Sequence, residues 1–506
     1  MRKANNIYRT LTKILVGCTQ HWLIMGPGKL FNSLRFYPIV GFFLILYFSV
    51  SKVIFDQIYK TTQVVIDEYF HIPQGLAYCN GNFSEWNPKI TTLPGLYIAS
   101  TIVSLVECNT YNLRLVNLLG SCINLIAFAS ILKYTYLTEK SQVKITLQAF
   151  SLTILPPLYF FSHVYYNETL SVMFLLIFTR MYLTKRYFFL LYIVGNFAVL
   201  MRQTNIIWVA LVPLYKLTDL YITSSRVYDN PYISDIKLST RSLIARVDRS
   251  KLKRYYNMWD LHCATKYHLS TMFETLTTYL IGQDLSQISV HFMILLTFAV
   301  FLFYNGSIDV GDKQAHETTI HLPQLLYFLL FYGVFGLPYV LFKLFSTIKL
   351  IFKEKMLVLL CGIVFILAVH YNTLVHPYLL ADNRHYTFYI WNHWFGKYDF
   401  AKYATIPVYI FLFFSLYDNI KDHNCISFLT PYALCLIPVL TFQKLIEIRY
   451  FLFPYIVIRL RFTKPSYALV IAEFLWYAAI NADMFYVFFT KEVYGQDFDY
   501  AQRIIW

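Results

Sequence analysis

The stretch FYPIVGFFLILYFSVSKVIF, residues 36–55, carries one charged side chain in twenty positions. A predominantly apolar segment of this length can cross a bilayer as a helix, because a helix satisfies every backbone N–H and C=O internally. Similar segments recur along the chain, with centres near residues 125, 154, 177, 195, 213, 295, 335, 364, 410, 435, 456 and 477. The sequence therefore predicts an all-α polytopic membrane protein with about 12 to 13 transmembrane helices.

The composition also indicates a membrane protein. Of the 506 residues, 57% are hydrophobic and 14% are charged, against about 25% charged in soluble domains. The net charge of +15 comes from Lys and Arg placed between the apolar segments, so nucleic acid is not expected as a partner. The eight cysteines, at positions 18, 79, 108, 122, 263, 361, 425 and 435, contain no CxxC pair. Neither zinc nor a disulfide framework is therefore expected, and Cys79 is expected to be a free thiol.

Basic residues indicate the orientation. Residues 1–35 hold six Lys or Arg and no acidic residue, which predicts a cytosolic N-terminus and an uncleaved first helix. If the short apolar piece 91–107 lies in the interface or re-enters, alternation puts the basic loop after residue 221 in the cytosol. The predicted regions are a cytosolic segment 1–35, a membrane module 36–221 with a first lumenal loop 56–112, a cytosolic loop 222–286, and a membrane module 287–506 with lumenal loops 305–323 and 372–401.

The first lumenal loop contains DEYFHIPQGLAYCNGNFSEWNPKITTLPGLY, residues 67–97. On a helix, Asp67 and Glu68 point about 100° apart, so only one of them can face a given substrate atom. One carboxylate could serve as a general base while the other orients a hydroxyl or a basic partner. His71 lies one turn after Asp67 and could hold that carboxylate or contact a phosphate. A solvated helix start is the structural alternative.

Two other polar groups fall on the same side of the membrane. VHPYLLADNRHYTFYIW, residues 375–391, contains His376, Asp382, Asn383, Arg384 and His385. An Arg beside a His can clamp a phosphate, although a salt bridge between Asp382 and Arg384 is the alternative. Arg202 and Gln203 interrupt a hydrophobic stretch and must face a partner or a wet cavity, unless they mark a helix boundary.

Other polar residues receive weaker interpretations. Lys313 belongs to a lumenal cluster with Asp309, Asp312, His316 and His321, whose irregular spacing matches no ligand pattern, so no metal is expected. Sequons occur at Asn82, Asn167 and Asn305, of which Asn305 is the best candidate for modification.

The quoted segments resemble those of a known family, together with LRLVNLLG from residue 113, RQTNIIW from residue 202, GDKQAHETTIHLPQ from residue 311 and the closing QRIIW. The chain is similar to the endoplasmic-reticulum alpha-1,2-glucosyltransferases of asparagine-linked glycosylation, with a fungal-type member expected. The resemblance implies the glycosyltransferase C superfamily fold with lumenal interfacial helices, a lumenal active site and no cofactor. It also implies dolichyl-phosphate-glucose as donor and a diglucosylated, dolichol-pyrophosphate-linked oligosaccharide as acceptor, to which an inverting transfer adds the third and last glucose.

The resemblance also implies roles for individual residues. Asp67 is the expected base and Glu68 a supporting residue. The donor phosphate is expected at Arg384, His385, Arg202 and His376. The acceptor side of the pocket is expected to include His71, Gln74, Asn87, Thr91, Thr92, Pro94, Gln203, Lys313, Asp382 and Asn383.

The chain departs from the family pattern twice. It has Asn167-Glu168 where the family tends to have Thr-Asp, and the run 447–451 reads EIRYF in place of Glu-Pro-Arg-Tyr-Tyr. Another dolichol-phosphate-sugar-dependent transferase of the same pathway is the first alternative. A transporter is a more distant one, because it predicts paired repeats and charges near the bilayer midplane. The sequence leaves open the choice between Asp67 and Glu68 as base, the exact helix count, the side of the C-terminus and the oligomeric state.

Overall fold

The computed structural model describes residues 27–136, 139, 141–184, 187–228, 285–311, 319–420, 426–462, 464–494 and 500–506. Within these ranges the secondary structure is helical, apart from a two-residue antiparallel pair formed by β1 (Glu492–Val493) and β2 (Gln502–Arg503). Most of the predicted cytosolic segment 1–35 and loop 222–286 lies outside the described residues. The prediction of an all-α membrane protein is confirmed.

The N-terminal half is a bundle around α5 and α8. Its elements are α2 (Pro27–Thr61), α3 (Glu68–Cys79), α4 (Gly95–Ser100), the 3-10 helix η1 (Thr101–Leu105), α5 (Thr110–Thr135), α6 (Gln142–Thr153), α7 (Pro156–Phe161), α8 (Asn167–Thr184), α9 (Phe188–Met201) and α10 (Asn205–Tyr228). α5 packs against both α8 and α6, and α2 covers α5 and α6 from outside. The short helices α3 and α4 pack on each other beside this bundle.

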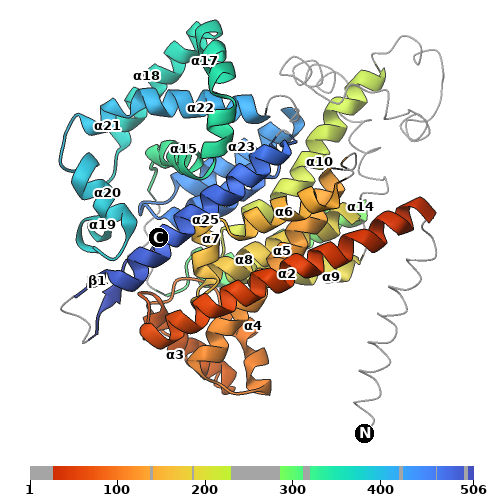
Figure 1. Cartoon of the computed structure of the whole chain (residues 1–506), viewed down its shortest axis with the longest axis vertical. Coiled ribbons are helices and arrows are strands. Elements are labelled where there is room, and N and C mark those ends of the chain that lie inside the picture. The colour runs from red at the N-terminus through yellow and green to blue at the C-terminus, as the bar shows by residue number, and fades with distance from the viewer. Residues whose placement is uncertain are drawn as a thin grey trace.

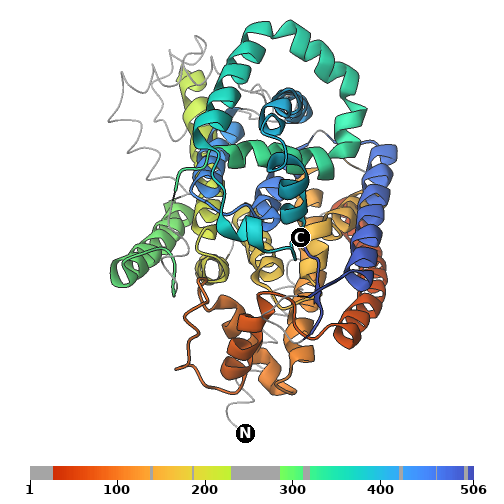
Figure 2. The ribbon, with the colours of Figure 1, turned by 90° about the vertical axis from the view of Figure 1, so that its left-hand side faces the viewer.

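The C-terminal half wraps around α22 and α23. Its helices are α14 (Leu285–Asn305), α15 (Pro323–Phe335), α16 (Leu337–Phe342), α17 (Leu344–Lys353), α18 (Lys355–Asn372), α19 (Pro377–Ala381), α20 (Tyr386–Ile390), the π-helical turn η2 (Trp391–Phe395), α21 (Ala401–Ala404), α22 (Ile406–Ile420), α23 (Ile426–Thr441), the 3-10 helix η3 (Ile448–Phe451), α24 (Leu452–Arg459) and α25 (Tyr467–Thr490). Figure 2 shows the helices from α15 to α18 as an arch around α22. The halves are joined because α23 packs on α10 and α25 packs on α6.

Five helices of the described chain are long and apolar enough to cross a membrane: Phe36–Thr61, Thr110–Thr135, Ile288–Asn305, Lys355–Asn372 and Tyr467–Thr490. The first of them, with 26 residues, is about 39 Å long at 1.5 Å per residue, more than the hydrocarbon core of about 30 Å. The other predicted segments also fall on helices, several of them shorter. The segment near 154 is two helices, since a break precedes Pro156 and Pro157. α24 has eight, mostly buried residues and does not cross alone.

The apolar piece 91–107 does not form a spanning helix. α4 and η1 together cover eleven residues, from Gly95 to Leu105, about half of what a span requires. The first residue of this piece is Gly95. A larger residue would not fit there, because a Cβ would lie 2.5 Å from the backbone carbonyl of Leu200, at the end of α9. α4 therefore packs tightly against the bundle, while Ile102, Leu105 and Val106 are exposed on its far side.

The ends of the helices separate into two groups. α3, α19, α20 and β1 lie at one end of the bundle, and the C-terminal end of α10 lies at the other (Figure 1). α10 leads into the predicted cytosolic loop, whereas α3 and α19 to α20 carry the polar residues of the predicted lumenal loops. The structure therefore places the C-terminal end of α10 and the polar motifs at opposite ends of the bundle.

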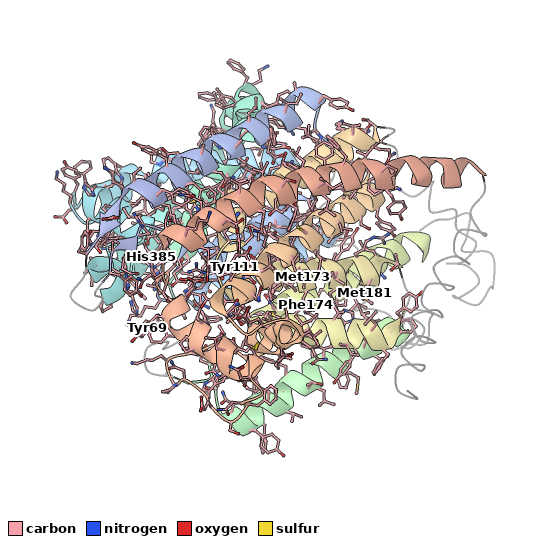
Figure 3. All side chains as sticks on the ribbon, turned by 60° about the horizontal axis from the view of Figure 1, so that its bottom comes forward. Tyr69, Tyr111, Met173, Phe174, Met181 and His385 are labelled. Atoms are coloured by element: carbon pink, nitrogen blue, oxygen red, sulfur yellow. A yellow bond between two sulfur atoms is a disulfide. The ribbon has the colours of Figure 1, made fainter. Side chains whose placement is uncertain are left out.

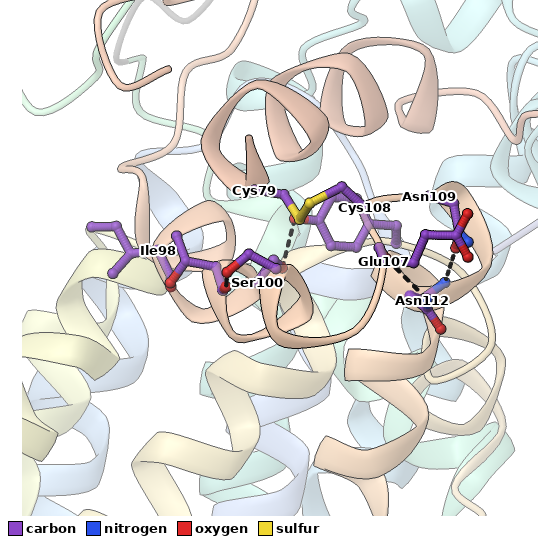
Figure 4. The surroundings of a disulfide bond; sticks show 10 residues. Cys79, Ile98, Ser100, Glu107, Cys108, Asn109 and Asn112 are labelled. Atoms are coloured by element: carbon purple, nitrogen blue, oxygen red, sulfur yellow. Dashed lines mark hydrogen bonds between the residues drawn. A yellow bond between two sulfur atoms is a disulfide. The ribbon is translucent and has the colours of Figure 1, made fainter. Parts of the chain in front are cut away.

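Cys79 is not a free thiol, so this prediction is wrong. Its sulfur forms a disulfide with Cys108, which joins the end of α3 to the segment after η1 (Figure 4). The free cysteines of the described residues are Cys122, Cys361 and Cys435. The disulfide closes the part of the first loop that contains α4. It thereby constrains the C-terminal end of α3, the helix that Asp67 precedes.

A buried ion pair stabilises the far side of the C-terminal half. Arg459, at the end of α24, pairs with Glu473 of α25 at 2.6 Å, and both side chains are fully buried. The hydroxyl of Tyr339 accepts from Arg459 and donates to Glu473. This pair links α16, α24 and α25.

Candidate active site

Asp67 lies immediately before the first residue of α3. Its backbone N–H donates to the hydroxyl of Tyr166 at 2.9 Å, and its side chain keeps 34% of its surface exposed. One carboxylate oxygen, Oδ2, accepts from Nη1 of Arg449 at 3.0 Å. Asp67 is therefore an accessible carboxylate with an arginine beside it.

Glu68, the next residue, is fully buried. Its two oxygens accept from Nε and Nη2 of Arg114 at 2.9 and 2.6 Å. They also accept from the backbone N–H groups of Val65 and Tyr165 at 3.0 and 2.6 Å. The Glu68 carboxylate thus joins α3, α5 and the turn before α8, and its position favours a structural role over contact with a substrate.

Arg449, on η3, is the centre of a charged cluster that we define as Asp67, Glu168, Arg202, Glu447 and Arg449. Arg449 donates to Glu447 and to Asp67, and its Nη1 is 3.8 Å from Glu168. Burial raises the pKa of Glu447, but Arg449 beside it outweighs this effect and lowers the pKa to about 2. Three carboxylates therefore share two arginines.

Arg202 completes the cluster from the turn between α9 and α10. It pairs with Glu168 at 3.2 Å and lies over the ring of Tyr450, 5.3 Å from its centroid. A small cavity of about 40 Å³ lies between Arg202, Arg449 and Glu168. Arg202 was predicted from sequence as a phosphate ligand, and the structure brings it to Glu168.

Arg384 and His385 lie close to this cluster, between α19 and α20. Arg384 donates to both oxygens of Asp382 at 2.8 Å, which is the salt bridge that the sequence left as an alternative. Burial opposes ionisation of Asp382, but Arg384 and His385 lower its pKa below the usual value. Burial opposes the charge of Arg384, but the hydrogen bonds and charge of Asp382, and after them the charge of Asp67, raise the pKa of Arg384 above its usual value. Figure 3 shows His385 and Tyr69, two residues after Asp67, toward the same end of the bundle.

The segment 502–506 packs against these residues. Nδ1 of His385 is 3.0 Å from the carbonyl oxygen of Trp506, and the backbone N–H of Ile505 donates to the carbonyl of Arg384 at 2.8 Å. The quoted QRIIW run is therefore part of the site.

An apolar cavity of about 260 Å³ adjoins the same segments. Its wall includes Tyr386, next to His385, as well as Ile446 and Ile448, which flank Glu447. Trp506 and Phe331 close another part of it. Charged groups and an apolar cavity are thus carried by the same short runs of chain.

His71 does not hydrogen-bond to Asp67. Its Nδ1 is 2.6 Å from the hydroxyl of Tyr97. Burial lowers the pKa of His71, and the opposing effects of Asp67 and Glu168 do not reverse this. A neutral imidazole is therefore expected beside the charged cluster at neutral pH.

The remaining predicted acceptor-side residues mostly hold the backbone of the first loop. Gln74 is buried and bonds to the backbone of Glu85 and Asn87. Gln203 donates to the carbonyl of Thr91 at 2.8 Å. The hydroxyl of Thr92 accepts from Asn167 at 2.9 Å, so a glycan on Asn167 would break this contact.

Other predicted residues lie apart or outside the described chain. Pro94 precedes α4, His376 is buried next to α19, and Asn383 is exposed in the turn after it. Lys313 lies outside the described residues. Among those that are described, no group of three His, Cys, Asp or Glu is arranged to hold a metal ion.

Sequence reasoning assigned no role to Arg449 or Arg114. Arg449 lies in the EIRYF run, which the sequence predicted on the side of Asp67 and marked as a departure from a family pattern, with no role for the arginine. Arg114 lies in LRLVNLLG, where its charge inside an apolar helix was the available signal.

Comparisons with known proteins agree over nearly the whole chain. The model of the DIE2/ALG10 family matches residues 61–460. A protein of Drosophila melanogaster named Dol-P-Glc:Glc(2)Man(9)GlcNAc(2)-PP-Dol alpha-1,2-glucosyltransferase is 37% identical over 473 residues, which cover 92% of this chain and 98% of the fly protein. Proteins of the same name from Rattus norvegicus and Candida albicans are 33% and 28% identical, covering 91% and 89% of this chain and 97% and 95% of their own lengths. These identities do not support the expectation of a fungal-type member. No solved structure matches the chain.

Proposed function

The chain belongs to the DIE2/ALG10 family, as its resemblance predicted, and on this premise we propose that it is a dolichyl-phosphate-glucose-dependent alpha-1,2-glucosyltransferase. It transfers glucose to the diglucosylated, dolichol-pyrophosphate-linked oligosaccharide and so adds the third and last glucose. The names of relatives that match over more than 90% of their own length support this substrate pair over that of an earlier enzyme in the same pathway.

The observation that carries the proposal is the amphiphilic site. A lipid phosphate has a charged head on a long apolar chain. Arg449, Arg384 and His385 are cationic or hydrogen-bonding groups suited to the head. The cavity of about 260 Å³ beside them has an apolar wall and suits the first units of an isoprenoid chain.

In the proposed reaction the Asp67 carboxylate accepts the proton of the acceptor 2-hydroxyl. The hydroxyl oxygen forms a bond to C1 of glucose as the bond from C1 to the phosphate oxygen breaks, with inversion at C1. Dolichyl phosphate leaves as an anion, so no general acid is needed. Asp67 is the better candidate base because it is 34% exposed, whereas Glu68 is sealed by Arg114 and two backbone N–H groups.

Arg449 has two tasks in this proposal. Arg449 pairs with Asp67 at 3.0 Å and with Glu447. The donor phosphate competes with Asp67 for the same guanidinium, so binding of the donor releases the Asp67 carboxylate for the acceptor hydroxyl.

The protein is a multi-pass membrane protein, and its proposed location is the membrane of the endoplasmic reticulum with the site in the lumen and the N-terminus in the cytosol. The Cys79–Cys108 disulfide supports a lumenal first loop, because disulfides persist in oxidising compartments. The basic residues of 1–35 and 222–286 support cytosolic locations for these segments.

The test is a transfer assay with the purified full chain in lipid. Dolichyl-phosphate-glucose is supplied with acceptors that carry no, one or two glucose residues, and products are separated by mass. The proposal predicts one added glucose on the diglucosylated acceptor alone. Transfer to a shorter acceptor instead would support the alternative enzyme of the same pathway, and no transfer to any acceptor by folded protein would reject both.

A further inference from the structure

Glu168 has a buried carboxylate oxygen that the proposed reaction does not use. The residue lies in the first turn of α8, and its side chain is 4% exposed. Oε1 accepts from Arg202 at 3.2 Å. Oε2 is buried and has no hydrogen-bond partner among the described residues. A carboxylate oxygen left in this state is costly unless a ligand or water completes it.

The orientation of Glu168 is fixed on both sides. Arg202 holds Oε1 and stacks over the ring of Tyr450. Nη1 of Arg449 lies 3.8 Å from the same oxygen. Because these contacts all involve Oε1, the carboxylate is anchored at one oxygen, and Oε2 is left without a partner among the described residues.

The cavity next to Glu168 is small, and polar and apolar residues both line it. Side chains of Ser171, Thr204, Asn205 and Gln443 line it together with the two arginines. Its volume of about 40 Å³ is too small for a sugar ring but large enough for a hydroxyl group or a water molecule. A second phosphate would be repelled by the carboxylate, so a neutral donor group is the better match.

The distance to the proposed base is short. Arg449 contacts Asp67 at 3.0 Å and is 3.8 Å from Glu168, so one guanidinium separates the two carboxylates. A glucose whose C1 is attacked by a hydroxyl held at Asp67 has its ring hydroxyls within a few ångströms of this guanidinium. Glu168 is thus placed to receive one of them.

We propose that Oε2 of Glu168 accepts a hydrogen bond from a ring hydroxyl of the transferred glucose, and that Glu168 thereby contributes to selection of the donor sugar. This inference rests on the proposed function. Hydrogen bonds to a charged group contribute enough to discriminate a hydroxyl from a hydrogen by roughly ten- to hundredfold. The sugar hydroxyl supplies the hydrogen-bond donor that Oε2 lacks among the described residues.

The experiment compares dolichyl-phosphate-glucose with its 2-, 3-, 4- and 6-deoxy analogues, using full-length protein in lipid and the diglucosylated acceptor. For the wild type we expect kcat/KM to fall roughly ten- to hundredfold for one deoxy donor more than for the others. For Glu168→Gln we expect a lower kcat/KM with glucose and a loss of most of that selective difference. Glu168→Asp keeps the charge but withdraws the oxygen, so it should also lose selectivity while remaining folded.

Glu85→Gln is the control for loss of a carboxylate, because Glu85 is an exposed acid of the first loop. It should keep the wild-type order of donors. If the Glu168 variants lower kcat/KM equally for all donors, Glu168 is a counter-ion of the arginines and the inference is overturned. The same holds if the wild type treats all donors alike. Both of these outcomes leave the proposed function intact as long as the wild type transfers glucose. A wild type that transfers glucose to no acceptor rejects both proposals.

Discussion

Asp67 and Glu68 are neighbours in sequence, yet they belong to two different kinds of ion pair. The Glu68 carboxylate is fully buried, receives two bonds from Arg114 and two from backbone N–H groups, and resembles in its burial the Arg459–Glu473 pair. Asp67 is one-third exposed and shares Arg449 with two other carboxylates. The comparison teaches that a carboxylate with all its partners in the protein supports the fold, while one with a shared and reachable partner is available for chemistry.

The first prediction concerns the sealed pair. Glu68→Gln leaves the charge of Arg114 buried without compensation, and we expect the free energy of unfolding to fall by about 3 to 5 kcal/mol. Thermal unfolding in lipid or detergent measures this change. Asp56→Asn is the control, because the Lys52–Asp56 pair is partly exposed and its loss should cost no more than about 1 kcal/mol. Equal free energies of unfolding for Glu68→Gln and Asp56→Asn would contradict a structural role for the Glu68–Arg114 pair.

The second prediction concerns the shared arginine. Arg449→Gln removes the proposed phosphate ligand, and we expect kcat/KM for the donor to fall by about 10² to 10³, or about 2.7 to 4 kcal/mol. Arg449→Lys should recover part of this loss, since it keeps the charge but not the planar fork. Lys491→Gln removes an exposed cation near β1 and should leave kcat/KM unchanged. Wild-type donor kinetics in Arg449→Gln would show that the phosphate binds elsewhere.

The third prediction concerns the loop that carries Asp67. The double variant Cys79→Ser, Cys108→Ser should lower the free energy of unfolding by about 2 to 4 kcal/mol, because the disulfide closes a loop of 29 residues. Reduction of the wild type should lower its melting temperature to that of the variant. Before reduction, alkylating reagents should not label Cys79 or Cys108. Rapid labelling of either in untreated, folded protein would contradict the disulfide.

The fourth prediction, with the smallest effect, concerns pH. Burial lowers the pKa of His71 below its ordinary value of 6.5, so the unfolded chain binds more protons than the folded one as pH falls. His71 therefore makes the protein lose stability below about pH 6.5, by less than about 1.4 kcal/mol per pH unit. His71→Gln should flatten the curve of melting temperature against pH below about pH 6.5. An unchanged slope would exclude a buried, neutral His71.

The sequence predicted the helical class well, because long apolar segments with basic flanks have few other solutions in a membrane. It predicted, through alternation along the chain, that Asp67, Arg202 and Arg384 lie on the same side of the membrane. It marked the piece 91–107 as short, but it counted the segment near residue 456 as a span, because only the burial and length of α24 show that this helix does not cross alone.

Arg449 and the disulfide were missed for a different reason. Asp67 and Arg449 are 382 positions apart, and a separation of 29 residues between Cys79 and Cys108 does not specify their pairing. Both contacts depend on how loops pack at the end of the bundle. Hydrophobic periodicity carries no information on that packing.

The most direct measurement is glucose transfer per folded molecule by Asp67→Asn and by Glu68→Gln, in one assay with dolichyl-phosphate-glucose and the diglucosylated acceptor. Asp67→Asn should lower turnover by about 10² to 10⁴ while keeping its melting temperature. Glu68→Gln should lose stability but keep turnover of its folded fraction within about tenfold of the wild type, since its carboxylate does not reach the substrate. An active Asp67→Asn beside a folded but inactive Glu68→Gln would reverse the assignment of the base.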